Sequence, residues 1–324
     1  DQAQIPNPAS TSCDDSRAVR TLHPGDPDAT AAAASAHRRW LELQRLLGVG
    51  FYRQVGVLTS LPAEEVDDAL TLLRSVGVEA QGLTPAALAQ RLPHLVFAPG
   101  TGAVLEPQAG VVLAEQALAA AAGWLRDQPT AEVRERAPVT RVDRDNGRVE
   151  LADGSTVTAD LVLVAAGPWS RDLLGAAVDS ALVMHRQTVL YCQVPSGLRA
   201  EWARTPAVGR LGHDGRGWLT PPGRSMKVSS AGVCREVDVL GGRAAEPAWR
   251  RRLEEMLGCM LAGAQRYTVL GARDFHYLAD RVTGGAVFTQ LRSAGAPVLA
   301  YPACGGGGFK TAPLVARRAA QWAC

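Results

Sequence analysis

The residues with the clearest chemical potential form the stretch Cys304-Gly305-Gly306-Gly307-Gly308-Phe309-Lys310, read CGGGGFK. Four glycines near a lysine suggest a phosphate loop, but that motif requires a glycine directly before the lysine, where Phe309 stands. A buried strand is expected over 296–301, and apolar residues follow the glycines at helical spacing up to Trp322. A strand, a glycine turn and a helix direct backbone N–H groups at an anion or an electron-rich ring. A nucleotide or flavin site is one interpretation, and a tight turn with a solvated lysine is the other.

The composition limits the classes of function. The chain has 324 residues, 47% of them apolar, and a net charge of +2 from 34 basic and 32 acidic residues. It is long enough for one large core or two smaller ones, and it lacks the concentrated positive charge typical of nucleic-acid binding. No apolar run reaches the roughly 18 residues that a membrane span needs. We therefore expect neither a nucleic-acid partner nor a membrane partner.

Cysteine and histidine spacing indicates neither a disulfide framework nor a metal site. The six cysteines show no CxxC pair, which favours free thiols and a cytoplasmic location. The six histidines lie far apart and form no zinc-type spacing with Cys, Asp or Glu. No metal is predicted, and the GxSxG motif of many hydrolases is absent.

The elements that must position any site are read from periodicity and turn residues. A hairpin is expected around Asp153-Gly154, followed by a strand over 161–166 that is uniformly apolar, as in a parallel strand covered on both faces. Further strands are expected over 187–194, 217–220, 225–229 and 286–291, and helices over 31–47, 63–76, 112–126, 247–261 and 311–322.

Five stretches, taken in order, share a pattern with one enzyme family. They are DSRAVR at 15–20, EPQAG at 106–110, the hairpin-to-strand unit ending in AAGPW at 165–169, the segment 221–227, and GGGGFK at 305–310. Together they resemble the flavin-dependent amine oxidases of the D-amino-acid oxidase superfamily, in particular the monomeric sarcosine oxidase branch. The resemblance runs over nearly the whole chain.

This resemblance implies an α/β fold in which two domains are interleaved. A Rossmann-like FAD-binding domain would comprise 1–51, 106–174 and 285–324, and an antiparallel or mixed-sheet substrate domain would comprise 52–105 and 175–284. Members of the family open with a strand, GxGxxG, a helix and a second strand ending in an acidic residue that holds the ribose, and Asp1 matches that residue. We therefore expect the phosphate-binding fingerprint about thirty residues upstream of this chain, so that FAD binding by this segment alone is in doubt.

The resemblance also implies roles for four basic residues. Arg17 would contact the flavin, while Arg20 and Lys310 would bind the substrate carboxylate. Lys227 lies on a strand in which buried and exposed residues are expected to alternate. Its positive charge would stabilise the anion that forms when oxygen accepts an electron. From the residues alone, the two arginines would pair with local acids and a strand lysine would face solvent.

Other positions complete the expected site, and some depart from the family. Phe275 stands where many relatives carry a cysteine bonded to the flavin, so we predict FAD held noncovalently. Tyr277 keeps the aromatic active-site position, whereas Ala231 replaces a histidine found in sarcosine-oxidising relatives; His276, His185 and His213 are candidates to compensate. The remaining cofactor contacts are expected at Ser16, Val142, Ala166, Gly167, Trp169, Gly305, Gly306, Gly307, Gly308, Phe309 and Lys310.

The sequence thus predicts an FAD-dependent oxidase acting on a C–N bond of a small amino or imino acid, with oxygen as acceptor and hydrogen peroxide as product. We expect a small-molecule amine or amino acid as the partner and a monomeric protein. Two alternatives stay open: a flavin dehydrogenase with another electron acceptor, and a non-catalytic binding module that retains the fold.

Overall fold

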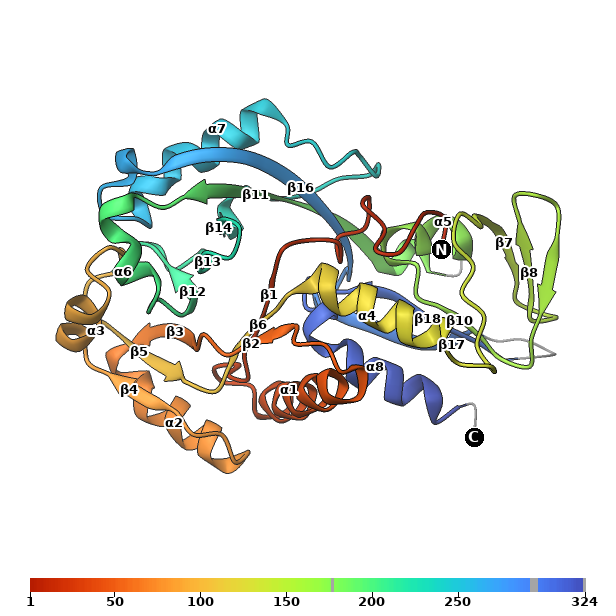
Figure 1. Cartoon of the computed structure of the whole chain (residues 1–324), viewed down its shortest axis with the longest axis horizontal. Coiled ribbons are helices and arrows are strands. Elements are labelled where there is room, and N and C mark those ends of the chain that lie inside the picture. Colours follow the sequence, from red (N-terminus) through yellow and green to blue (C-terminus); the bar gives the residue numbers. More distant parts are fainter. Residues whose placement is uncertain (176–177, 292–296, 323–324) are drawn as a thin grey trace.

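The computed structural model describes residues 1–175, 178–291 and 297–322 and shows a mixed α/β fold (Figure 1). Its largest element is a nine-stranded sheet in the order β15-β11-β14-β13-β12-β3-β5-β4, with β16 paired to the other edge of β11. These strands are β3 (Val57–Pro62), β4 (Gln81–Leu83), β5 (Thr101–Glu106), β11 (Leu182–Gln193), β12 (Ala207–Leu211), β13 (Gly217–Thr220), β14 (Met226–Ser230), β15 (Cys234–Glu236) and β16 (Thr268–Asp280).

Two separate stretches of the chain build this sheet. The parallel pairing of β12 with β3, with Val208 opposite Leu58, joins strands from 57–106 to strands from 182–280. The long antiparallel pair β11 and β16 runs across the top of Figure 1. A core of apolar side chains, including Leu190, Leu219 and Met226, packs between this sheet and the helices α3 (Pro85–Arg91) and α7 (Pro247–Met256).

Three small sheets make up the other half of the molecule. One has the order β1-β6-β2, another β10-β18-β17 and the third β7-β8-β9. β10 and β18 are parallel, with Leu163 opposite Leu299, and β17 is antiparallel to β18. Their strands are β1 (Arg17–Val19), β2 (Tyr52–Arg53), β6 (Gly110–Val112), β7 (Val139–Asp143), β8 (Arg148–Leu151), β9 (Thr156–Thr158), β10 (Val162–Val164), β17 (Ala286–Leu291) and β18 (Val298–Cys304).

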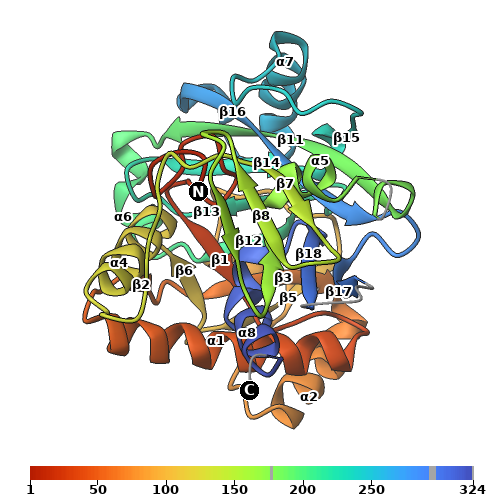
Figure 2. The same cartoon turned by 90° about the vertical axis from the view of Figure 1, so that its right-hand side faces the viewer.

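The helices α1 (Pro27–Leu47) and α8 (Gly308–Ala320) pack side by side, as the two views agree (Figures 1 and 2). Asp26 caps α1 by accepting from the backbone N of Ala29 at 2.9 Å, and Gly48 ends the helix in the left-handed conformation. The ring of Trp40 on α1 stacks on that of Phe309 on α8, with centroids 5.1 Å apart. The other helices are α2 (Val66–Ser75), α4 (Ala114–Arg126), α5 (Ser170–Leu174) and α6 (Arg199–Trp202).

The expected elements are present, with differences at their ends. α8 begins at Gly308 rather than at 311, so the last glycine of the CGGGGFK stretch already belongs to the helix. α7 ends at Met256 and continues as a 3-10 turn, whereas a helix to 261 was expected. Position 296, the expected start of β18, lies outside the described residues.

The expectation that the strand over 161–166 is covered on both faces was wrong for β10. Leu163 is 41% exposed, while Val162 and Val164 on the opposite face are buried. β10 lies at the edge of a three-stranded sheet among the described residues, so Leu163 is partly open to solvent although its partner on β18, Leu299, is fully buried.

Candidate functional site

Lys227 lies on β14, inside the nine-stranded sheet, and its side chain is only 2% exposed. Its Nζ donates to Asp14 Oδ2 at 2.6 Å and to the backbone oxygen of Ser16. The expected alternation along this strand was wrong, because all five residues of β14 are buried. Neighbouring strands pair with β14 on both sides and both of its faces are covered, so the ammonium group must find its partners inside the protein.

Asp14 is the carboxylate that compensates this buried lysine. It is fully buried, accepts from the hydroxyl of Tyr191 at 2.6 Å, and forms an ion pair with Arg17 at 3.0 Å. Burial raises the pKa of Asp14, but Lys227 and Arg17 outweigh that effect and lower the pKa to about 2. Burial and Arg17 lower the pKa of Lys227 to about 8, against the attraction of Asp14. At neutral pH the pair is therefore mostly ionised.

The sequence reasoning missed Asp14 and Tyr191. Asp14 stands directly before the stretch 15–20 that carries the family resemblance, and its i,i+3 spacing to Arg17 was the available signal. Tyr191 had no such local signal, because its place opposite Lys227 follows from the pairing of β11 with β14.

Phe275, at the position of the family's attachment cysteine, lies buried against two guanidinium groups. The Cζ atom of Arg17 is 5.0 Å from the centroid of the Phe275 ring, and that of Arg243 is 4.4 Å away. Arg17 is thereby held between this ring and Asp14, and it also donates to the backbone oxygen of Thr11. Cation–π contact of this kind favours a flat arginine on the ring.

Arg20 and Lys310 come together near Glu106, although they are far apart in the sequence. Glu106 is buried and uses its carboxylate oxygens to accept from the backbone N atoms of Thr21, at 2.8 Å, and Leu22, at 3.1 Å. Burial lowers the pKa of Lys310 to about 8, with a further lowering from Arg20 and an opposing effect from Glu106. Burial raises the pKa of Glu106, and the two backbone bonds and Arg20 only partly oppose this.

This end of the site carries surplus positive charge. In the part of the chain that the structure describes, no carboxylate lies within 4.0 Å of the charged atoms of Arg20 or Lys310. Room for the guanidinium comes from Gly209, where an added Cβ would stand 3.1 Å from Nη1 of Arg20. A half-buried guanidinium beside a half-buried ammonium group, with one carboxylate already occupied by backbone donors, favours an anionic ligand.

Tyr277, on β16, lies between a histidine, a thiol and the glycine turn. Its ring stacks on His185 with centroids 5.2 Å apart, and its hydroxyl is 3.4 Å from Sγ of Cys234. A Cβ added to Gly306 would stand 3.4 Å from Cζ of Tyr277, so the turn runs close against the tyrosine ring. Burial raises the pKa of Tyr277, which keeps the hydroxyl neutral and able to donate.

Of the three histidines considered as replacements at the position of Ala231, His185 stacks on the ring of Tyr277. The buried His276 accepts from the backbone N of Gly241 at 3.3 Å, and burial lowers its pKa. His213 is exposed in the connection between β12 and β13.

The glycine turn needs glycine for two physical reasons. Gly305 and Gly306 have φ angles of 55° and 74°, the left-handed region that other residues adopt at a cost. At Gly308, an added Cβ would stand 2.5 Å from Cβ of Cys304. The helix α8 that starts here has no side-chain cap, so the N–H groups of its first turn, including those of Phe309 and Lys310, are available to a ligand.

Asp1, the expected ribose-binding residue, makes its contacts within the first residues of the chain and with the segment before β7. Asp1 is exposed, and its Oδ1 accepts from the backbone N of Ala3 at 3.0 Å and from Nδ2 of Asn7 at 2.9 Å. The backbone oxygen of Asp1 accepts from the N of Ala137 at 2.9 Å, which places the start of the chain beside the segment leading into β7.

Four further expected contacts group around β10. Val142, on β7, is buried in a core that it shares with Val162 and Val164, so its side chain points away from solvent. Ala166, Gly167 and Trp169 follow the carboxyl end of β10, where Gly167 has a φ angle of 58°. The structure thus brings Val142 and the 166–169 turn to one small sheet region, where β10 runs parallel to β18, the strand that leads into the glycine turn.

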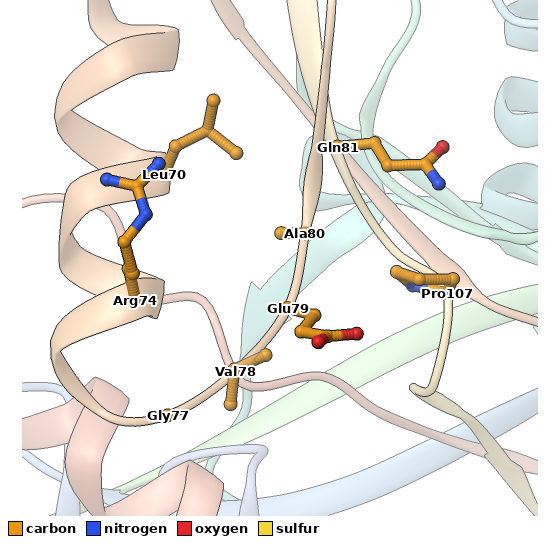
Figure 3. A pocket seen from close by; sticks show the side chains of 8 residues that line it. All are labelled: Leu70, Arg74, Gly77, Val78, Glu79, Ala80, Gln81 and Pro107. Atoms are coloured by element: carbon orange, nitrogen blue, oxygen red, sulfur yellow. The ribbon is translucent and has the colours of Figure 1, made fainter.

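Two surface hollows were found among the described residues, one away from the expected site residues and one beside Asp15 and Ser16. Figure 3 shows a groove of about 510 Å³ between α2 and β4, to which none of the expected site residues contributes. A cavity of about 220 Å³ lies beside Asp15 and Ser16, and the hydroxyl of Ser16 donates to that of Thr220 at 3.1 Å. The groove in Figure 3 is lined by Leu70, Arg74, Gly77, Val78, Glu79, Ala80, Gln81 and Pro107.

Within the described ranges, no group of three or more His, Cys, Asp and Glu side chains is arranged to hold a metal ion. Among the helices described, none combines the length and apolar character needed to span a bilayer.

Residues 5–322 match a protein family described as FAD dependent oxidoreductase. The chain belongs to this family. It is similar to the peroxisomal sarcosine oxidase of Mus musculus, with 27% identity over 185 residues, which covers 54% of this chain and 45% of that protein. The chain therefore spans less than half the length of this curated relative in the match.

Solved structures of low sequence identity share the fold. A modified fructosyl peptide oxidase from Aspergillus nidulans superposes with a TM-score of 0.79 at 16% identity, covering 99% of this chain and 81% of that one. NikD, described as an unusual amino acid oxidase essential for nikkomycin biosynthesis, superposes with a TM-score of 0.76 at 15% identity, covering 98% and 85% of the two chains. These likenesses confirm the expected mixed α/β fold.

The geometry around the glycine turn fits a flavin. The left-handed Gly305 and Gly306 let the backbone approach a flat group closely, and the uncapped start of α8 provides N–H donors for an electron-rich ring. Arg17, which lies over the Phe275 ring, and the turn 305–309 would hold the ring system, while Ala166, Gly167 and Trp169 would lie toward the nucleotide. When bound, FAD supplies the two-electron acceptor of an oxidation.

Proposed function

We propose that this protein oxidises the C–N bond of a small amino or imino acid with FAD and oxygen. The amine loses two electrons and two protons to become an imine, water hydrolyses the imine, and oxygen takes up the electrons and protons to give hydrogen peroxide. The proposal rests on the surplus positive charge of Arg20 and Lys310. The nearby carboxylate of Glu106 already accepts hydrogen bonds from two backbone N atoms. The printed names of the relatives, oxidases of sarcosine, fructosyl peptides and an amino acid, support the same substrate class.

Each residue then has a definite task. The planar guanidinium of Arg20 and the ammonium of Lys310 bind the substrate carboxylate and so orient the amine. Tyr277, whose hydroxyl stays neutral, bounds the site on the side of the glycine turn and offers a donor or acceptor to the amine nitrogen. Arg20 is charged at any working pH, whereas Lys310, with a pKa of about 8, must keep its proton to contribute.

Lys227 serves the reaction with oxygen. Negative charge develops on oxygen as electrons arrive, and a positive charge fixed in a buried place stabilises it more strongly than the same charge in water. Asp14 and the Ser16 carbonyl hold the ammonium in one position, so little reorganisation is needed when oxygen is reduced.

The same proposal includes noncovalent attachment, because Phe275 offers no thiol to form a bond with the flavin. It also includes the interleaved boundaries 1–51, 106–174 and 285–324 for FAD and 52–105 and 175–284 for substrate. These boundaries place the strands of the large sheet, except for Glu106 at the end of β5, in the substrate domain, whereas Arg20 and Lys310 belong to the FAD domain. A monomer in the cytoplasm is the expected state, to be checked by light scattering and by cell fractionation.

The test is the visible absorption spectrum of this chain and of an upstream-extended chain, each purified with added FAD, before and after acid precipitation. We expect a flavin spectrum that is lost from the precipitate, followed by peroxide release with small secondary or primary amino acids. Turnover with an artificial acceptor but little peroxide would instead favour a dehydrogenase. If neither form retains flavin, the enzyme proposal is wrong and a binding module replaces it.

A further inference from the structure

His23, which the sequence reasoning did not select, contacts the proposed carboxylate-binding lysine. It lies in the connection between β1 and α1, and its Nε2 is within hydrogen-bonding distance of Nζ of Lys310, 287 positions away in the chain. The side chain is half-buried. No other side chain in the described residues makes a hydrogen bond to this ammonium group.

The backbone of His23 is held in place by hydrogen bonds to residues at the start of α1. The hydroxyl of Thr30 accepts from the backbone N of His23 at 3.1 Å, and its single proton is shared between the backbone oxygens of Asp26, at 2.8 Å, and His23, at 3.2 Å. The backbone N of Asp26, the cap of α1, also donates to the oxygen of His23, at 3.0 Å. The position of the ring is therefore coupled to the start of a 21-residue helix rather than to a loose loop.

The same helix also holds the backbone of Lys310. The indole Nε1 of Trp40 donates to the Lys310 carbonyl at 2.9 Å, and Trp40 stacks on Phe309. Lys310 is thus bound at its main chain by Trp40 and at its tip by His23, both positioned by α1. Two points of attachment on one rigid element define where the ammonium can lie.

The chemistry of the contact defines the protonation of each partner. An ammonium group donates and cannot accept, so His23 must present a bare Nε2 and carry its proton on Nδ1. Burial, Lys310 and Arg20 lower the pKa of His23 to about 4, although Asp26 raises it. The ring is therefore neutral at pH 7. Lys310, with a pKa of about 8, also feels the charges of Arg20 and Glu106, and the charge of Arg210 acts on Arg20.

We propose that His23 is a positioning residue that aims the Lys310 ammonium at the substrate carboxylate and keeps it protonated. This inference rests on the proposed function and deepens it. A neutral acceptor stabilises the ammonium without neutralising its charge, whereas a carboxylate in the same place would compete with the substrate. The acid-binding end of the site then consists of Arg20 and Lys310, with His23 behind the lysine.

The test compares His23→Leu, which removes the acceptor, with His23→Gln, whose amide oxygen restores one. Propionate serves as a carboxylate probe without an amine, and its dissociation constant is measured by calorimetry on the full chain from pH 6 to pH 9.5. We expect His23→Leu to weaken propionate binding roughly tenfold at pH 8. The pH at which binding is half lost on the alkaline side should also move to a lower value. His23→Gln should recover most of the affinity, and His213→Leu, at an exposed site, should match the wild-type protein.

A second measurement needs no variant. In protein labelled with 15N histidine, the His23 ring should show the neutral tautomer protonated at Nδ1 at pH 7, and its signals should shift when propionate is added. A charged ring at pH 7, or equal propionate affinity in His23→Leu and wild type, would overturn the inference. If wild type oxidises amines in that case, only the role of His23 is wrong; if it neither binds propionate nor oxidises amines, the proposed function is wrong as well.

Discussion

Replacing Gly305 with alanine tests whether the glycine turn has the geometry described. At a φ angle of 55°, a residue with a Cβ loses about 1 kcal/mol relative to glycine in the left-handed region. The added Cβ would also stand 2.8 Å from the carbonyl oxygen of Gly284 and 2.8 Å from the carbonyl carbon of Gly285. Backbone atoms cannot move aside cheaply, so overpacking adds roughly 2 kcal/mol. We expect Gly305→Ala to lower the free energy of unfolding by about 3 kcal/mol.

The matched control is Gly48→Ala, at the end of α1. Its φ angle of 65° is similar, but an added Cβ meets no atom within 4 Å, so only the backbone cost of about 1 kcal/mol applies. Urea unfolding of both variants, with the slope compared to wild type, measures the difference. Equal destabilisation of the two variants would show that the turn does not pack against 284–285. Retention of added FAD provides a second comparison, with loss expected in Gly305→Ala alone.

Three further predictions concern the buried charges and the contact of α1 with α8. Lys227→Met should slow reoxidation by oxygen roughly a hundredfold while leaving reduction by substrate within a few-fold, measured by stopped flow; equal slowing of both halves would contradict its role. The Asp14 pKa, lowered from its usual 3.8 to about 2, contributes about 2 kcal/mol of stability that is complete above pH 4 and is lost as pH falls toward 2. Urea unfolding across that range should show the loss in wild type and a flatter profile in Asp14→Asn. Trp40→Phe removes the bond to the Lys310 carbonyl and should cost about 1 kcal/mol, with unchanged unfolding as the contrary result.

The local elements could be predicted because their causes are local. Asp153-Gly154 between two short apolar runs indicates a hairpin, since the turn conformation depends on those two residues. The strand, glycine turn and helix around 298–320 follow from apolar spacing and from the need for left-handed residues at Gly305 and Gly306. The start of α8 at Gly308 was not predicted, because glycine is unfavourable in a helix. Here the close packing of Gly308 on Cys304 leaves no room for a side chain.

The partners of the charged groups could not be predicted in this way. Lys227 was expected on a strand of alternating exposure, but its burial depends on β11 and β13, which reach β14 from elsewhere in the chain. Asp14 lies 213 positions from Lys227, and His23 lies 287 positions from Lys310. Neither separation leaves a periodic trace in the sequence.

The sequence by itself therefore determined the order of the elements, the glycine turn and the family, since dihedral preferences and motif spacing are properties of neighbouring residues. Only the tertiary structure decided which charges are buried, which acid balances which base, and how far each pKa moves. Those quantities depend on desolvation and on distances of a few ångströms between segments that are remote in the chain. The proposed carboxylate-binding end of the site, with Arg20, Lys310 and His23, forms only when α1, α8 and the end of β1 pack together.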